Sequence, residues 1–157
     1  MKKILKYSPE NISKFHNLKK KVVLVGGCFD ILHIGHLKFL EQAKKSGDIL
    51  VVLLEDDKNV KRLKGNGRPF FTQDERAVMI SALKPVDYVL KLSEMNYDRD
   101  YEELIITLKP DVIAATENDP MKLKKSSQAK RINCKFVEIP YLQTYSTSKL
   151  ANKLGIE

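Results

Sequence analysis

Residues 22–40, VVLVGGCFDILHIGHLKFL, decide the fold that we predict for this chain. The apolar run Val22–Val25 is typical of a short buried strand, and Gly26 and Gly27 follow it, where the backbone can turn tightly and approach a ligand. A helical spacing comes next, carried by Ile34, Leu37, Leu40 and Ala43. The first N–H groups of a helix lack intrahelical partners and carry the positive end of its dipole, so this strand–turn–helix segment predicts a phosphate site.

Two of the three histidines in the chain lie within this segment. His33 and His36 are three residues apart, so both point to the same side of the helix start, where imidazoles can donate to phosphate oxygens. No third ligand lies nearby in the sequence, and we therefore predict no metal held by the protein here. Two exposed histidines on an ordinary helix are the alternative interpretation. The strand–turn–helix context favours a functional pair.

Strands and helices are predicted to alternate along the rest of the chain. Residues Ile49–Leu54 are six consecutive apolar residues, the mark of a strand buried on both faces of a parallel sheet. Such alternation indicates an α/β fold, a Rossmann-like parallel five-stranded sheet with helices on both faces. We expect one domain over residues 1–157, with a lead-in helix segment in residues 1–20. The other predicted strands cover residues 87–90, 111–115 and 135–139, and the other helices 8–18, 56–63, 72–83, 101–108 and a last one that begins at 145–150. Thr72 and Glu75 have the spacing of a capping box at the start of the helix 72–83. Arg76 lies in its first turn, where a cation opposes the dipole, which indicates that it serves another purpose.

Composition limits the kinds of partner. The 157 residues fit one domain with a proper core, and the net charge of +8 indicates an anionic partner. The basic residues are scattered, and no aromatic–basic RNA-binding motif is present, so we expect a polyphosphate and no nucleic acid. No apolar run reaches the length of a membrane span, and the two cysteines form no framework. The N-terminus turns polar after Leu5, so we expect a cytoplasmic protein with no membrane partner.

Two more segments are candidates for phosphate binding. Residues Lys64–Pro69 form a cationic, glycine-containing loop after the second strand, which can close over a triphosphate, and a plain surface loop is the alternative. The hydroxyls of Ser146, Thr147 and Ser148 stand at the start of the last helix. They can cap that helix or bind phosphate beside its free N–H groups, and the two functions are compatible.

The motif GGCFDILHIGH resembles the G-x-F-D-x-x-H-x-G-H signature of the nucleotidyltransferase superfamily with the H-x-G-H motif, the cytidylyltransferase-like group. The resemblance continues through RLKGNGRP, DER, ALKPVDYV and YSTSKL, and so covers about Ser8 to Leu150. It extends in particular to the adenylyltransferase domain of bacterial ADP-heptose synthase. This resemblance implies an enzyme that transfers a nucleotidyl group from a nucleoside triphosphate to a phosphorylated acceptor and releases pyrophosphate.

The resemblance also implies roles for individual residues. His33 and His36 would act on the phosphates, with His36 nearest the transition state, and Lys64 falls on the family's phosphate-binding lysine. Arg76 would lie beside the ligand, although a structural ion pair remains open, and Asp30 would orient the site or a metal, or cap the turn. The nucleotide-binding set comprises Gly26, Gly27, Cys28, Phe29, Asp30, Gly35, His36, Arg76, Thr116, Tyr145, Ser146, Thr147 and Ser148. Magnesium is expected on the nucleotide phosphates, and we expect a homodimer.

The expected substrates are ATP and a sugar 1-phosphate. Glycerol-phosphate cytidylyltransferases carry an arginine and a glycine where this chain has Tyr141 and Thr144, which favours ATP over CTP. Residues 115–119, ATEND, replace a Lys-Gly-Gly-Asp-like stretch of the heptose enzymes, so other acceptors stay open. The alternatives are a CTP-dependent enzyme for glycerol 3-phosphate or phosphoethanolamine, an FMN adenylyltransferase, and a nucleotide- or RNA-binding protein without catalysis.

Overall fold

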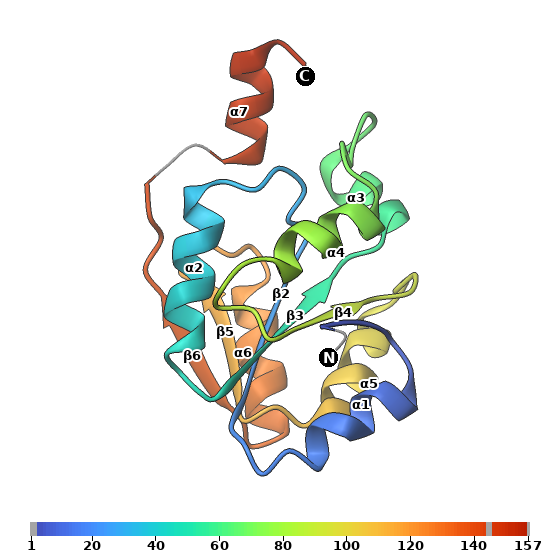
Figure 1. The fold of residues 1–157 in the computed structure, drawn as a ribbon, viewed down its shortest axis with the longest axis vertical. Helices are drawn as coiled ribbons and strands as arrows, with labels where there is room; N and C mark the ends of the chain where they lie inside the picture. Colours follow the sequence, from blue (N-terminus) through green and yellow to red (C-terminus); the bar gives the residue numbers. More distant parts are fainter. Residues whose placement is uncertain (1–2, 144–145, 157) are drawn as a thin grey trace.

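A six-stranded sheet runs through the middle of the molecule and carries helices on both faces (Figure 1). The structure is a computed structural model that describes residues 3–143 and 146–156. The strand order is β1-β4-β3-β2-β5-β6, and every neighbouring pair is parallel. The Rossmann-like α/β prediction, with helices on both faces, is confirmed.

The elements follow one another as the sequence pattern predicts, with shifts of a few residues at their ends. The strands are β1 (Ile4–Lys6), β2 (Val22–Gly27), β3 (Ile49–Leu54), β4 (Tyr88–Lys91), β5 (Val112–Thr116) and β6 (Lys135–Ile139). The helices are α1 (Pro9–His16), α2 (Ile34–Lys44), α3 (Asp57–Lys64), α4 (Gln73–Ser81), α5 (Asp98–Leu108), α6 (Lys122–Arg131) and α7 (Thr147–Leu154).

The central strands contribute side chains to two apolar cores, one on each face of the sheet. Successive side chains on a strand point to opposite faces, so the unbroken apolar run of β3 sends Val51 to one face and Val52 to the other, and both are fully buried. The first core packs under α1, α5 and α6, and the second packs under α2 and α4. A polar residue anywhere in the middle of β3 would therefore lie in one of the two cores, which explains the absence of alternation there.

The prediction of five strands was wrong by one. The additional strand, β1, lies at the edge of the sheet and pairs in parallel with β4, so that Ile4 lies opposite Val89. Its three residues stand close to lysines and directly before a helix, and three residues are too few to display the period of a strand. Within the described residues, no helix combines the length and the apolar content that crossing a membrane requires.

The topology fixes where a ligand can bind. The chain passes from β2 to β3 on one side, whereas β5 pairs with β2 on the other side, so the strand order reverses at β2. Ligands of open parallel sheets bind beyond the carboxyl ends of the strands at this switch point. The segment from Gly26 to His36 leaves the sheet there.

Candidate active site

A cavity of about 820 Å³ opens at the carboxyl edge of the sheet, beside the end of β2. Most of the residues predicted to bind a nucleotide line it. From the glycine–histidine segment these are Gly26, Gly27, Cys28, Phe29, His33, Gly35 and His36. From distant parts of the chain, Lys64, Thr116 and Ser146 join them. The structure thus brings three of the predicted segments to one space.

The tight turn after β2 lies at Phe29, and the two glycines belong to the strand. Phe29 has a φ of 46°, whereas Gly26 and Gly27 are the last residues of β2. A Cβ on Gly27 would lie 2.9 Å from Cε2 of the Phe29 ring, so a side chain there would displace the ring. Gly27 therefore makes room for Phe29, whose buried ring lies 5.2 Å from the His36 ring, centroid to centroid.

The two histidines form a stacked pair at the start of α2. Their ring centroids are 3.8 Å apart, and the rings are inclined by 28°. His33 occupies the N-cap position, but its side chain makes no capping bond, which leaves the first N–H groups of α2 available to an anion. The Nδ1 atoms of both rings are buried and lack a hydrogen-bond partner among the described residues. Buried polar atoms without partners are rare, and an ordered water or a bound ion commonly accounts for them.

Burial lowers the pKa of both imidazoles and so favours their neutral form in the free protein. It lowers the pKa of His36 to about 3, and the nearby His33 and the Lys64 ammonium contribute to the same shift. Burial also lowers the pKa of His33. Each neutral ring carries one N–H, which it can donate to a phosphate oxygen. A bound anion would favour the charged form and so raise both pKa values.

We expect the stability of the free protein to fall as the pH drops from about 6.5 towards 3, because the unfolded chain takes up a proton on His36 that the folded chain excludes. Above pH 6.5 both states are neutral at this residue and the contribution is fully present. Chemical denaturation at several pH values measures the slope, and His36→Gln should reduce it. A slope that His36→Gln leaves unchanged would contradict the low pKa.

Lys64 is the cation that reaches this cavity from the other side. It is the last residue of α3, and Gly65 ends the helix with a φ of 98° while its N–H donates to Lys61 O at 2.8 Å. The charge of Lys64 lowers the pKa of His36 and opposes the rise that burial causes in the pKa of the Cys28 thiol. Lys64 therefore acts electrostatically on the same space as the histidine pair.

Asp30 lies outside the cavity lining. Its carboxylate is buried, and its Oδ2 accepts from Arg68 Nε at 2.7 Å. Its Oδ1 accepts from the backbone N–H groups of Phe70 at 2.9 Å and Phe71 at 3.2 Å. The carboxylate thus binds the segment that returns from the cationic loop, which differs from the nucleotide contact predicted from the resemblance.

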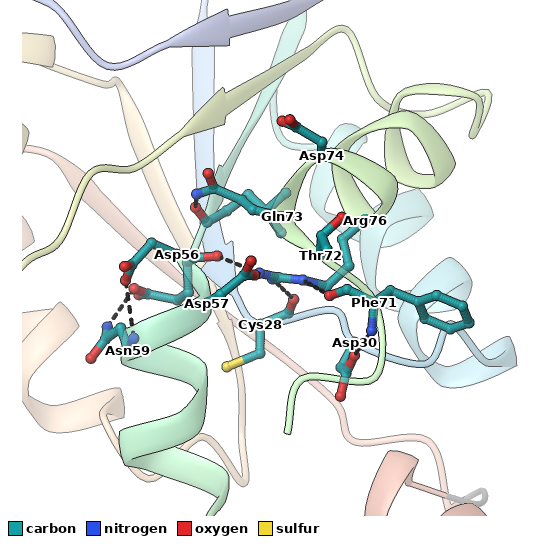
Figure 2. Close-up of polar contacts among 12 residues, drawn as sticks. Cys28, Asp30, Asp56, Asp57, Asn59, Phe71, Thr72, Gln73, Asp74 and Arg76 are labelled. Carbon is teal, nitrogen blue, oxygen red and sulfur yellow. Dashed lines mark hydrogen bonds and ion pairs between the residues drawn. The ribbon is translucent and has the colours of Figure 1, made fainter. Parts of the chain in front are cut away.

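Arg76 is completely buried at the hub of three loops (Figure 2). Its Nη1 donates to Cys28 O at 2.5 Å, its Nε donates to Phe71 O at 3.0 Å, and its Nη2 donates to Glu55 O at 2.8 Å and to Asp57 Oδ1 at 2.7 Å. These bonds join the end of β2, the start of α3 and the segment before α4. The geometry favours the structural ion pair over the ligand-side arginine. The predicted capping box of α4, Thr72 with Glu75, is confirmed and places Arg76 in the first turn.

The hydroxyls at the start of α7 have separate roles. Ser146 caps the helix by accepting from the Lys149 N–H at 3.2 Å, and it also lines the cavity. The Thr147 hydroxyl donates to Ile31 O at 3.0 Å and so ties α7 to the turn before His33. Ser148 is exposed and is not part of the cavity lining. The predicted ligand residue Tyr145 lies outside the described residues.

Replacing Thr147 with valine should clearly reduce kcat/KM and should lower the melting temperature only slightly. The change removes the bond to Ile31 O, worth about 1 kcal/mol in a typical protein, while Ser146 still caps the helix. Steady-state kinetics and thermal melting measure both effects. Thr107→Val is the matched control, because its hydroxyl donates to Glu103 O on α5, away from the cavity. Equal kinetics in the two variants would leave Thr147 with a structural role alone.

The sequence did not point to the cavity residues Lys38, Phe39 and Gln42, which line the wall that α2 forms. Asn118 and Asp119, from the stretch 115–119 that was compared with the heptose enzymes, line the rim after β5. With Gly35, the α2 residues follow the i, i+3, i+4, i+7 spacing of one helix face. That spacing on the predicted helix was the available signal for a cavity wall, but the same spacing is typical of any helix face that packs against a core.

Known proteins resemble this chain in sequence and in fold. A family profile described as cytidylyltransferase-like matches residues 24–152. The bifunctional protein HldE of Campylobacter jejuni is 39% identical over 153 residues, 97% of this chain, and HldE of Desulfatibacillum aliphaticivorans is 37% identical over 150 residues, 93% of this chain. The chain spans only 32% and 30% of the length of these two curated relatives.

Solved structures agree in fold. A lipopolysaccharide core biosynthesis protein from Thermoplasma volcanium superposes with a TM-score of 0.63 at 28% identity, covering 80% of this chain and 99% of its own. A pantoate–beta-alanine ligase from Francisella tularensis, complexed with beta-gamma ATP and beta-alanine, has a TM-score of 0.60 at 17% identity and covers 90% of this chain and 68% of its own. The second likeness concerns the fold alone.

Proposed function

Because the chain belongs to the cytidylyltransferase-like family and is therefore a nucleotidyltransferase, we propose that it transfers AMP from ATP to a sugar 1-phosphate and releases pyrophosphate. The observation that carries the proposal is the stacked, neutral His33–His36 pair at an uncapped helix start, facing the same cavity as Lys64. The resemblance of its motifs to the adenylyltransferase domain of bacterial ADP-heptose synthase supports a sugar phosphate as the acceptor class.

The protein has to place the two substrates and to stabilise the negative charge that develops on the phosphates. An oxygen of the acceptor phosphate attacks the α-phosphorus, a new P–O bond forms, and the bond to the β-phosphate oxygen breaks as pyrophosphate leaves. Neutral His36 donates its N–H to the α-phosphate, where negative charge develops, and His33 donates beside it. Lys64 and Ser146 hold the departing β- and γ-phosphates. The acceptor oxygen is already anionic, so the reaction needs no strong base.

Magnesium enters the proposal with the nucleotide. Among the described residues, no cluster of three His, Cys, Asp or Glu side chains is placed to hold a metal, and both oxygens of the Asp30 carboxylate already accept bonds from the protein. A Mg²⁺ ion bound with the nucleotide would neutralise charge on its phosphates, and in such sites this ion usually keeps several of its waters. The expected homodimer belongs to the proposal as well, and sedimentation equilibrium measures it.

A competition assay tests the substrates. The protein is given equal ATP and CTP with Mg²⁺ and a panel of phosphorylated acceptors, and products are resolved by mass. We expect mainly an ADP-sugar from a sugar 1-phosphate. Mainly CDP-linked product would overturn the choice of ATP, and ADP-linked product with glycerol 3-phosphate, phosphoethanolamine or flavin mononucleotide alone would overturn the choice of acceptor.

A further inference from the structure

One buried ion pair has no part in the chemistry described so far. The side chains of Asp30 and Arg68 are 1% and 2% exposed, and Oδ2 and Nε are 2.7 Å apart. Desolvation offsets most of the attraction in a buried pair, so such pairs contribute little net stability compared with apolar residues of similar size. What the pair joins is therefore more informative than how strongly it binds.

The pair joins the two phosphate-binding segments. Asp30 stands three residues before His33, and Arg68 stands four residues after Lys64. The same carboxylate accepts from the N–H groups of Phe70 and Phe71, and the Arg68 guanidinium lies 4.8 Å from the centre of the Phe70 ring. Asp30 thus holds both the side chain and the backbone of the segment that follows Lys64.

The two glycines between Lys64 and Arg68 pack against little of the described chain. Gly65 and Gly67 have φ values of 98° and 87°, and apart from their own chain neighbours no described atom lies within 4 Å of the Cβ position at either residue. Before Lys64, helix α3 is held at Asp57, which binds Arg76, and near its end, where Arg62 Nη2 donates to Met95 O at 3.2 Å. Lys64 therefore lies between the anchored helix α3 and the Asp30–Arg68 pair, which holds the chain on its other side.

We propose that the Asp30–Arg68 pair is a positioning device that holds Lys64 against the His33–His36 pair and so sets the affinity for the triphosphate. Asp30 and Arg68 touch no substrate and act through Lys64. The inference rests on the proposed function, in which Lys64 binds the departing phosphates.

A double-mutant cycle tests this dependence. Arg68→Met removes the charge at similar length, and Lys64→Ala removes the ammonium. We expect each single change to weaken Mg-ATP binding about tenfold, and the double variant to bind no more than about twofold more weakly than Lys64→Ala alone, because residues that act as a unit are not additive. Titration calorimetry measures the Kd, and KM for ATP should follow it. Losses that multiply would overturn the proposal.

A second variant and a control separate positioning from stability. Asp30→Asn keeps the shape but removes the charge, and it should speed hydrogen exchange at the Phe70 and Phe71 amides and raise the Kd as Arg68→Met does. It also replaces Arg68→Met in the cycle if that variant does not fold. Leu104→Ala on α5, in the core under the opposite face, should lower the melting temperature and leave the Kd unchanged. A Kd that is the same in Asp30→Asn and wild type would overturn the proposal.

These measurements do not depend on the acceptor. Calorimetry and hydrogen exchange require only the folded protein and Mg-ATP. If wild type transferred no nucleotidyl group but the cycle remained non-additive, the proposed function would fail and the positioning role of Asp30–Arg68 would stand. If wild type transferred a nucleotidyl group but the losses in affinity multiplied, the proposed function would stand and the positioning role of Asp30–Arg68 would fail.

Discussion

His36→Ala should lower kcat by about 10²–10³, the scale for losing one preorganised donor to the transition state. The ring is stacked on His33, backed by Phe29 and kept neutral by burial, so its N–H is fixed before the substrate arrives. The hydrogen bond that the His36 N–H donates to the α-phosphate strengthens as negative charge develops there. The loss in turnover should therefore be much larger than the loss in ATP affinity. Steady-state kinetics and calorimetry on the same preparation measure both quantities.

His16→Ala is the matched control, since His16 lies on α1, outside this cavity, with its Nε2 3.1 Å from Leu108 O. That variant should keep turnover within about twofold, as expected for a residue without a catalytic role. A folded His36→Ala protein with turnover within threefold of wild type would show that the assigned role is wrong.

Arg76→Met should destabilise the protein by at least about 3 kcal/mol. The change removes four hydrogen bonds and leaves the carbonyls of Cys28, Glu55 and Phe71 without their donor, and each unsatisfied buried group costs about 1–3 kcal/mol. Asp57 is 45% exposed, so water can solvate its carboxylate and we assign little of the loss to that ion pair. Urea denaturation measures the free energy of unfolding.

The control for Arg76 is Arg131→Met, which removes an exposed arginine bonded to Glu102 and should change stability by less than about 0.5 kcal/mol. A ligand-side Arg76 would give the opposite pattern, with ATP binding lost and the free energy of unfolding nearly unchanged. That result would contradict the structural role and restore the prediction made from the resemblance.

The fold was predictable where its causes are local. The six apolar residues of β3 and the capping box of Thr72 and Glu75 each express a structure within a few neighbouring positions, and both are present as predicted. The edge strand β1 was missed because its hydrogen bonds go to β4, more than eighty residues away, and three residues show no period of their own.

The candidate site was likewise predictable where its residues are close in sequence and was missed where they are far apart. His33 and His36 were recognisable because their spacing and the strand before them lie within one short segment. The bonds of Asp30 to Arg68 and of Arg76 to Cys28 span 38 and 48 residues, and no local pattern displays them. A cation in the first turn of α4, where it opposes the dipole, was the signal that Arg76 serves another purpose, and only the folded chain shows that this purpose is to join three loops.

The origin of the transferred phosphate tests the central claim most directly. ATP labelled with ³²P at the α-phosphate or at the γ-phosphate is incubated with the protein, Mg²⁺ and a sugar 1-phosphate, and the products are separated. Attack at the α-phosphorus predicts that the α-label appears in the sugar nucleotide and the γ-label in pyrophosphate. A γ-label on the sugar, or an α-label that remains in ATP and ADP, would contradict nucleotidyl transfer.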